Sequence, residues 1–134
     1  HGVVHRNLSP ASIYLNPSGL AKVGDFDFAR VPTITRTLAK TGLSLVSGRH
    51  VSPEQAFHAS DVDARADIYS LGAVWYDMLF RPAVDDPLDR ARIEDALISE
   101  DGQEILRSML SEQRSKRPAS MDEVQYWLDL LSAE

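Results

Sequence analysis

Residues 64–80, ARADIYSLGAVWYDMLF, determine how this chain folds. Apolar side chains recur in this stretch at intervals of three and four residues, the spacing of one face of an α-helix. They are Ile68, Leu71, Val74, Trp75, Met78 and Leu79. Alanine and glycine on the other faces indicate a helix that is buried nearly all round. We therefore expect a mainly α-helical domain built around this one central helix.

Shorter elements are expected on both sides of the central helix. Two apolar runs at residues 13–15 and 20–23 flank an Asn-Pro-Ser-Gly turn, a pattern that predicts a small β-hairpin. Residues 31–50 are rich in Thr, Ser and Gly and predict a long loop. Four further helices are expected, at residues 53–58, 86–99, 103–110 and from 120 onward. The last of these begins with a capping box, Ser-Met-Asp-Glu.

The composition narrows the function classes. The chain has 134 residues, a net charge of −6 and no cysteine, so we expect one soluble domain without disulfides or thiolate chemistry. The negative charge argues against nucleic acid as a partner and against membrane contact by this segment. No apolar run reaches the roughly 18 residues that span a bilayer. We expect a cytoplasmic location, and the start at His1, already inside a motif, favours a longer parent protein that could carry an anchor elsewhere.

Five short motifs follow one another along the chain. They are HRNLSP at 5–10, GDFDFAR at 24–30, VSPEQ at 51–55, ADIYSLG at 66–72 and SKRP at 115–118. Each is weak alone, but their order and spacing together resemble the C-terminal lobe of a bacterial-type Ser/Thr protein kinase over essentially the whole chain. The resemblance implies one kinase-like lobe over residues 1–134. Its parts are a catalytic loop, hairpin and DFG-like segment at 1–30, an activation-type loop at 31–52, and a helical subdomain at 53–134.

The resemblance also implies that the catalytic loop has lost its chemical residues. Asn7 stands where the family has its catalytic Asp, and an amide can hydrogen-bond a hydroxyl but does not take its proton. Ser9 stands at the position of the loop Lys and carries no charge. Ser12 stands at the position of the loop Asn, a ligand of the second Mg²⁺ beside the nucleotide, and a hydroxyl is a weaker ligand.

Asp25 keeps the metal-binding position of the family's DFG segment, so the resemblance implies that it binds Mg²⁺ with the nucleotide. Asp27 replaces the glycine, and its Cβ restricts the backbone where Gly would allow movement. The two carboxylates could hold a metal together, or Asp27 could simply face solvent. We favour the second interpretation, because two carboxylates alone are a weak metal signature.

Five further residues have structural roles in the family. The resemblance implies that His5 packs in the core and that Asp67 accepts hydrogen bonds from the backbone N–H groups of the His5-Arg6 segment. It also implies a buried ion pair between Glu54 and Arg117, which would tie the end of the long loop to the helices. The alternative is that these two residues are separate surface charges.

The long loop offers hydroxyls that a kinase could modify. In the family, the residue at Arg6 reaches a phosphate on this loop. The candidate phosphorylation sites are Thr33, Thr35, Thr37 and Thr41, together with Ser44 and Ser47. An unmodified, solvated Thr-rich loop is an equally good interpretation.

Several parts of an active kinase do not occur in this sequence: the glycine-rich phosphate loop, the strand Lys and the helix Glu. We therefore expect no cofactor in this segment, with ATP and Mg²⁺ bound only in a parent protein that supplies the missing N-terminal lobe. We expect the central helix to expose an apolar flank. A protein partner is expected to bind the long loop or the helices after residue 85.

Three hypotheses for the function follow. We favour a catalytically impaired, pseudokinase-like domain that serves as a binding, scaffolding or regulatory module in signalling. The alternative is a slow but genuine ATP-dependent Ser/Thr kinase, in which Asn7 orients the hydroxyl and Asp25 holds the metal. A structural remnant without any ligand is the third hypothesis.

Overall fold

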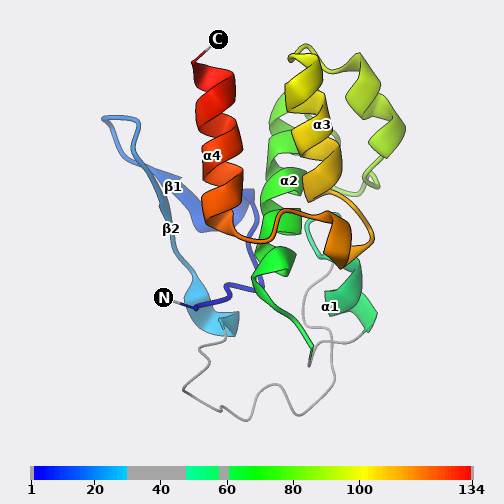
Figure 1. Cartoon of the computed structure of the whole chain (residues 1–134). Coiled ribbons are helices and arrows are strands. Elements are labelled where there is room, and N and C mark those ends of the chain that lie inside the picture. Colours follow the sequence, from blue (N-terminus) through cyan, green and yellow to red (C-terminus); the bar gives the residue numbers. More distant parts are fainter. Residues whose placement is uncertain (1, 30–47, 58–60, 134) are drawn as a thin grey trace.

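The computed structural model describes residues 2–29, 48–57 and 61–133. Its elements in chain order, with η marking a 3₁₀-helix, are η1 (Pro10–Ser12), β1 (Ile13–Leu15), β2 (Ala21–Val23), η2 (Phe26–Phe28), α1 (Pro53–Phe57), α2 (Ala64–Phe80), η4 (Arg90–Asp95), α3 (Glu100–Met109), η5 (Arg114–Lys116) and α4 (Met121–Ser132). Figure 1 shows α2 as the long central helix, with α3 and α4 alongside it and the hairpin at one edge. The expected mainly α-helical architecture is confirmed.

Helix α2 has the predicted bounds because both of its ends carry stop signals. The carboxylate of Asp63 accepts a hydrogen bond from the backbone N–H of Arg65 at 2.9 Å and caps the N-terminus. Arg81 adopts a left-handed backbone, with φ of 45°, and ends the helix. The buried residues cover every face, as predicted: Ala66, Asp67, Ile68, Tyr69, Ser70, Gly72, Ala73, Val74 and Tyr76. Met78 is 73% exposed, so the expected apolar flank lies in the last turn.

The core lies where α3 and α4 meet α2. Ile68 of α2, Met109 of α3 and Val124 of α4 form one buried cluster. A second cluster joins Tyr76 of α2 to Leu106 of α3. Burial of large apolar side chains contributes roughly 1.5–3 kcal/mol each, so these contacts are the main source of stability.

Gly72 sets how closely α2 and α3 approach. A Cβ at this position would lie 3.0 Å from the Cβ of Met109 and 3.2 Å from Cδ2 of Leu110. The Met109 Cβ is fixed to the α3 backbone and cannot move aside by rotation. We therefore expect Gly72→Ala to lower the free energy of unfolding by about 1 kcal/mol, because overpacking outweighs the gain in helix propensity. Urea unfolding would measure this loss of stability. A Gly72→Ala variant more stable than the wild type would contradict it and show that α2 and α3 can move apart at little cost.

The predicted hairpin is also confirmed. Strands β1 and β2 pair antiparallel, with Tyr14 opposite Lys22. Asn16 closes the turn because its Oδ1 accepts hydrogen bonds from the backbone N–H groups of Ser18 and Leu20 at 3.1 and 2.8 Å.

The α-helix expected at residues 86–99 is wrong. The chain forms only the short 3₁₀-helix η4 there, because Asp89 caps it at one end and the backbone becomes extended at Ala96. A new N-cap follows at Ser99, whose Oγ accepts from the backbone N–H of Gly102. This cap also starts α3 at Glu100, three residues before the predicted start at Gln103.

The capping box of α4 is present in a modified form. The Ser120 hydroxyl accepts a hydrogen bond from the backbone N–H of Glu123 at 3.2 Å, as predicted. The Glu123 carboxylate reaches back to the N–H of Ala119 at 2.7 Å, one residue earlier than in the usual box. Side chains therefore accept hydrogen bonds from two backbone N–H groups at the N-terminal end of α4.

Candidate functional site

The loop that precedes the hairpin is held against α2 by Asp67. Asp67 Oδ2 accepts a hydrogen bond from the backbone N–H of His5 at 2.7 Å, and Oδ1 accepts one from Arg6 at 2.9 Å. Gln55 of α1 adds a third contact, because its Nε2 donates to the Arg6 carbonyl at 2.6 Å. Arg6 has a φ of 69°, a conformation that non-glycine residues rarely adopt. The predicted hydrogen bonds are present, and they hold a strained turn in place.

Burial affects the charge on Asp67. It raises the pKa of the Asp67 carboxyl, and the N–H groups of Arg6 and His5 offset part of this rise because they stabilise the carboxylate. The buried site therefore favours the charged form of Asp67 less than water does, and the two N–H groups limit this cost.

His5 connects the loop to the segment after β2. It is 4% exposed, and its Nδ1 accepts a hydrogen bond from the backbone N–H of Asn7 at 3.2 Å. Because Nδ1 is an acceptor, Nε2 carries the proton and donates it to the Gly24 carbonyl at 2.7 Å. The ring packs edge-on against Phe26, with 4.7 Å between centroids. The expected packing of His5 in the core is confirmed.

Ser9 and Ser12 close the turn that follows Asn7. The Ser12 hydroxyl donates to the Ser9 carbonyl at 3.0 Å and accepts from the Ser9 backbone N–H at 3.1 Å. Ser12 is 3% exposed. Its hydroxyl is thus engaged within the loop, which argues against the expected role as a metal ligand.

Asp25 is bonded to a residue that the sequence analysis missed. The Tyr14 hydroxyl donates a hydrogen bond of 2.6 Å to Asp25 Oδ2. The hydrogen bond and the negative charge of Asp25 raise the pKa of the Tyr14 phenol. Gly24 makes room for the ring, since a Cβ there would lie 2.9 Å from Tyr14 Cε2. The register of the hairpin could have indicated this contact. Tyr14 pairs with Lys22, and Gly24 is the next residue on the same face, which brings the Tyr14 ring close to Asp25.

The predicted ion pair between Glu54 and Arg117 is present. The two guanidinium nitrogens of Arg117 donate to Glu54 Oε1 and Oε2 at 2.6 and 2.8 Å. The Arg117 side chain is fully buried. It also donates to the carbonyls of Ser111 and Arg65 and lies 4.9 Å from the centre of the Tyr69 ring. Burial alone would raise the pKa of Glu54, but the hydrogen bonds and charge of Arg117, together with hydrogen bonds from the Glu54 backbone and Ser52, lower the pKa below its ordinary value.

A second ion-pair cluster, around Asp77, was not expected from the sequence. Arg49 Nε donates to Asp77 Oδ1 at 2.6 Å, and His50 Nε2 lies 2.7 Å from Asp77 Oδ2. The same guanidinium reaches the carbonyls of Ala83, Val84 and Asp86. The cluster fixes the end of the long loop to the C-terminal end of α2.

The Asp77 cluster predicts how stability depends on pH. Burial opposes ionisation of Asp77, but the hydrogen bonds from Arg49 and His50 outweigh it and lower the pKa below its ordinary value of 3.8. A lowered pKa stabilises the fold above pH 3.8, and that contribution is lost as the pH falls through the folded-state value. In urea unfolding, wild type should be more stable than Asp77→Asn near neutral pH, and the difference should shrink as the pH falls below about 4. A stability difference between wild type and Asp77→Asn that grows as the pH falls would contradict a lowered pKa for Asp77.

A protein-family model matches nearly the whole chain. The model of the protein kinase domain matches residues 1–128. The chain belongs to the protein kinase family. The relatives that it resembles are bacterial Ser/Thr protein kinases. The assignment of residues 5–12 to a catalytic loop and of residues 25–27 to a DFG segment stays a prediction.

Three bacterial kinases illustrate this similarity. The DNA damage-responsive serine/threonine-protein kinase RqkA of Deinococcus radiodurans is 42% identical over 76 residues, covering 57% of this chain and 11% of RqkA. PknB of Mycolicibacterium smegmatis is 40% identical over 80 residues, 59% of this chain and 13% of PknB. PknA of Corynebacterium glutamicum is 38% identical over 77 residues, 58% of this chain and 16% of PknA. The chain therefore spans a small part of each relative.

Among the described residues, the predicted metal position at Asp25 offers few side-chain ligands. The described part of the chain contains no group of three or more Asp, Glu or His that could hold a metal ion. Asp25 shares one carboxylate oxygen with Tyr14, and the hydroxyl of Ser12 is engaged with Ser9. Asp27 lies in η2 and is exposed. Mg²⁺ usually takes one or two carboxylates and completes its octahedron with water and substrate phosphates, so a metal at Asp25 would need those further donors.

Some expected features lie outside the described residues. These are the candidate phosphorylation sites Thr33, Thr35, Thr37, Thr41, Ser44 and Ser47. Among the residues that are described, no helix combines the length and the hydropathy needed to cross a membrane.

Proposed function

We propose that this kinase-family chain is impaired in phosphoryl transfer and serves as a protein-binding or regulatory module in signalling. The main support for this proposal is that one loop keeps its structural contacts but lacks the family's chemical residues. Asp67 holds the loop with two hydrogen bonds, as a working loop would require. In contrast, the three loop positions that perform chemistry in the family carry other residues here: Asn7 in place of Asp, Ser9 in place of Lys and Ser12 in place of Asn.

The replacements remove specific contributions to the reaction. An amide at Asn7 orients a hydroxyl but takes no proton, and a lost general base costs roughly 10²–10⁴ in rate, or about 3–5 kcal/mol of barrier. Ser9 supplies no positive charge to the phosphoryl group, which removes electrostatic stabilisation as well.

ATP and Mg²⁺ enter this proposal only through the parent protein. The glycine-rich loop and its Lys–Glu pair would have to come from a lobe outside these residues. Within the chain, the Tyr14 hydroxyl would have to leave Asp25 Oδ2 before a metal could use both carboxylate oxygens.

A slow but genuine kinase is the second candidate. The observation that favours it is the intact set of contacts around His5 and Asp67, since positioning alone accounts for much of phosphoryl-transfer catalysis.

Metal binding separates the two candidates. Mn²⁺ is titrated into the ¹⁵N-labelled chain, and paramagnetic broadening of backbone amides is followed by NMR. We expect no selective broadening at residues 24–26 below about 1 mM Mn²⁺, and a gain of broadening in Tyr14→Phe, which releases Asp25. Selective broadening in the wild type that disappears in Asp25→Asn would instead favour the slow kinase.

A further inference from the structure

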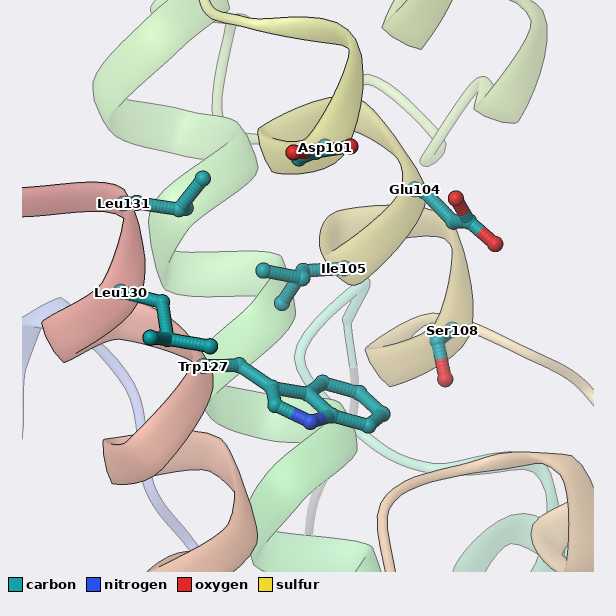
Figure 2. Close-up of a pocket in the computed structure, with 7 residues that line it drawn as sticks. All are labelled: Asp101, Glu104, Ile105, Ser108, Trp127, Leu130 and Leu131. Carbon is teal, nitrogen blue, oxygen red and sulfur yellow. The ribbon is translucent and has the colours of Figure 1, made fainter. Parts of the chain in front are cut away.

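A pocket opens between α3 and α4, away from the catalytic loop. It has a volume of about 310 Å³. Figure 2 shows the residues that line it, which are Asp101, Glu104, Ile105 and Ser108 from α3 and Trp127, Leu130 and Leu131 from α4. No contact described for the kinase site involves these side chains.

The floor and one wall of the pocket are apolar. Ile105 and Leu131 lie across from one another, with Trp127 below them (Figure 2). Leu130 is 53% exposed, so the apolar surface continues out of the pocket toward solvent. Exposed apolar surface of this kind gains free energy when a partner covers it.

The surroundings of the pocket are acidic. Asp101 and Glu104 are exposed and lie on the same face of α3, three residues apart. Helices α3 and α4 together carry six carboxylates and one guanidinium, and the carboxylates are Glu100, Asp101, Glu104, Asp122, Glu123 and Asp129. The guanidinium, Arg107, donates a hydrogen bond to Gln103.

We propose that this groove docks a basic amphipathic helix of a protein partner. One or two aliphatic side chains of the partner fill the pocket against Trp127 and Ile105, and Lys or Arg residues spaced by three or four lie beside Asp101 and Glu104. The volume lies at the lower end of small-molecule sites, so it suits anchoring side chains better than a whole cofactor. An anionic lipid surface is disfavoured because the acidic rim repels it.

This inference rests on the proposed role as a binding module and gives that module a partner of defined chemistry. Its test measures binding only, so its failure would leave the phosphotransfer question untouched. The probe is a synthetic helical peptide of Leu and Lys, and its twin has Glu in place of every Lys.

Trp127 can report the binding. The chain has two tryptophans, so Trp75→Phe leaves Trp127 as the single fluorophore. Calorimetry on the unaltered chain repeats the titration in case Trp75→Phe disturbs the core. The test variant is Asp101→Asn/Glu104→Gln. The matched control is Glu94→Gln/Asp95→Asn, which removes two exposed carboxylates from η4, outside the pocket lining.

We expect the Lys peptide to bind roughly tenfold more tightly than its Glu twin, with a shift in Trp127 emission. The test variant should weaken binding of the Lys peptide about fivefold, and the control variant less than about twofold. Equal binding of the two peptides would overturn the proposal. So would an equal loss in both variants, or no binding of the Lys peptide up to about 1 mM.

Discussion

Replacing Arg117 by Ala is expected to lower the free energy of unfolding by about 3–5 kcal/mol. The substitution leaves the Glu54 carboxylate partly buried without its partner, at a site where that side chain is only 14% exposed. It also removes the donors that satisfy the carbonyls of Ser111 and Arg65. The ion pair itself need not be a large net gain, since the cost comes from leaving one charge behind.

Urea unfolding followed by circular dichroism measures this loss. Arg114→Ala is the matched control, because Arg114 pairs with Asp61 at 3.3 Å and that carboxylate is 82% exposed. An exposed pair of this kind contributes at most about 1 kcal/mol. If Arg117→Ala fails to fold, Glu54→Gln tests the same pair while keeping the shape of the side chain. Equal losses for Arg117→Ala and Arg114→Ala would contradict a structural role for the buried pair.

Replacing Asp67 by Ala should cost about 2–5 kcal/mol, because two buried backbone N–H groups lose their acceptor. The groups belong to His5 and Arg6, and Arg6 would also be released from its left-handed backbone conformation. Asp67→Asn should cost less, since its amide keeps one oxygen acceptor.

Hydrogen exchange locates this effect as well as measuring it. The amides of His5 and Arg6 should exchange faster in Asp67→Ala, ahead of the amides in the core of α2. Asp63→Ala serves as the control on the same helix, because it removes only an N-cap worth about 1 kcal/mol. Unchanged exchange at His5 and Arg6 would show that another contact holds the loop.

Predictions from the sequence were right where the interacting residues lie close together in the chain. Helix α2, the hairpin and the cap of α4 were predicted because their signals lie within a few residues of each other. The helix expected at 86–99 was wrong because two capping residues, Asp89 and Ser99, divide that segment. The prediction relied on the spacing of apolar residues and did not consider these two residues as N-caps.

Contacts between distant residues could be predicted only where a family pattern carried them. Glu54 and Arg117 are 63 positions apart, and the kinase motifs around them predicted the pair. The Asp77 cluster lies outside those motifs, and so does Tyr14, the partner of Asp25, so nothing in the family pattern indicated these contacts. The pocket between α3 and α4 was also unforeseen, because its shape depends on how the two helices pack.

We propose that the catalytic loop keeps its shape without its chemistry. The most direct measurement is transfer of labelled phosphate from ATP by the full-length parent protein, with Mg²⁺ or Mn²⁺ present. We expect the wild type to incorporate no more phosphate than its Asp25→Ala variant. Robust turnover in the wild type that Asp25→Ala abolishes would contradict it.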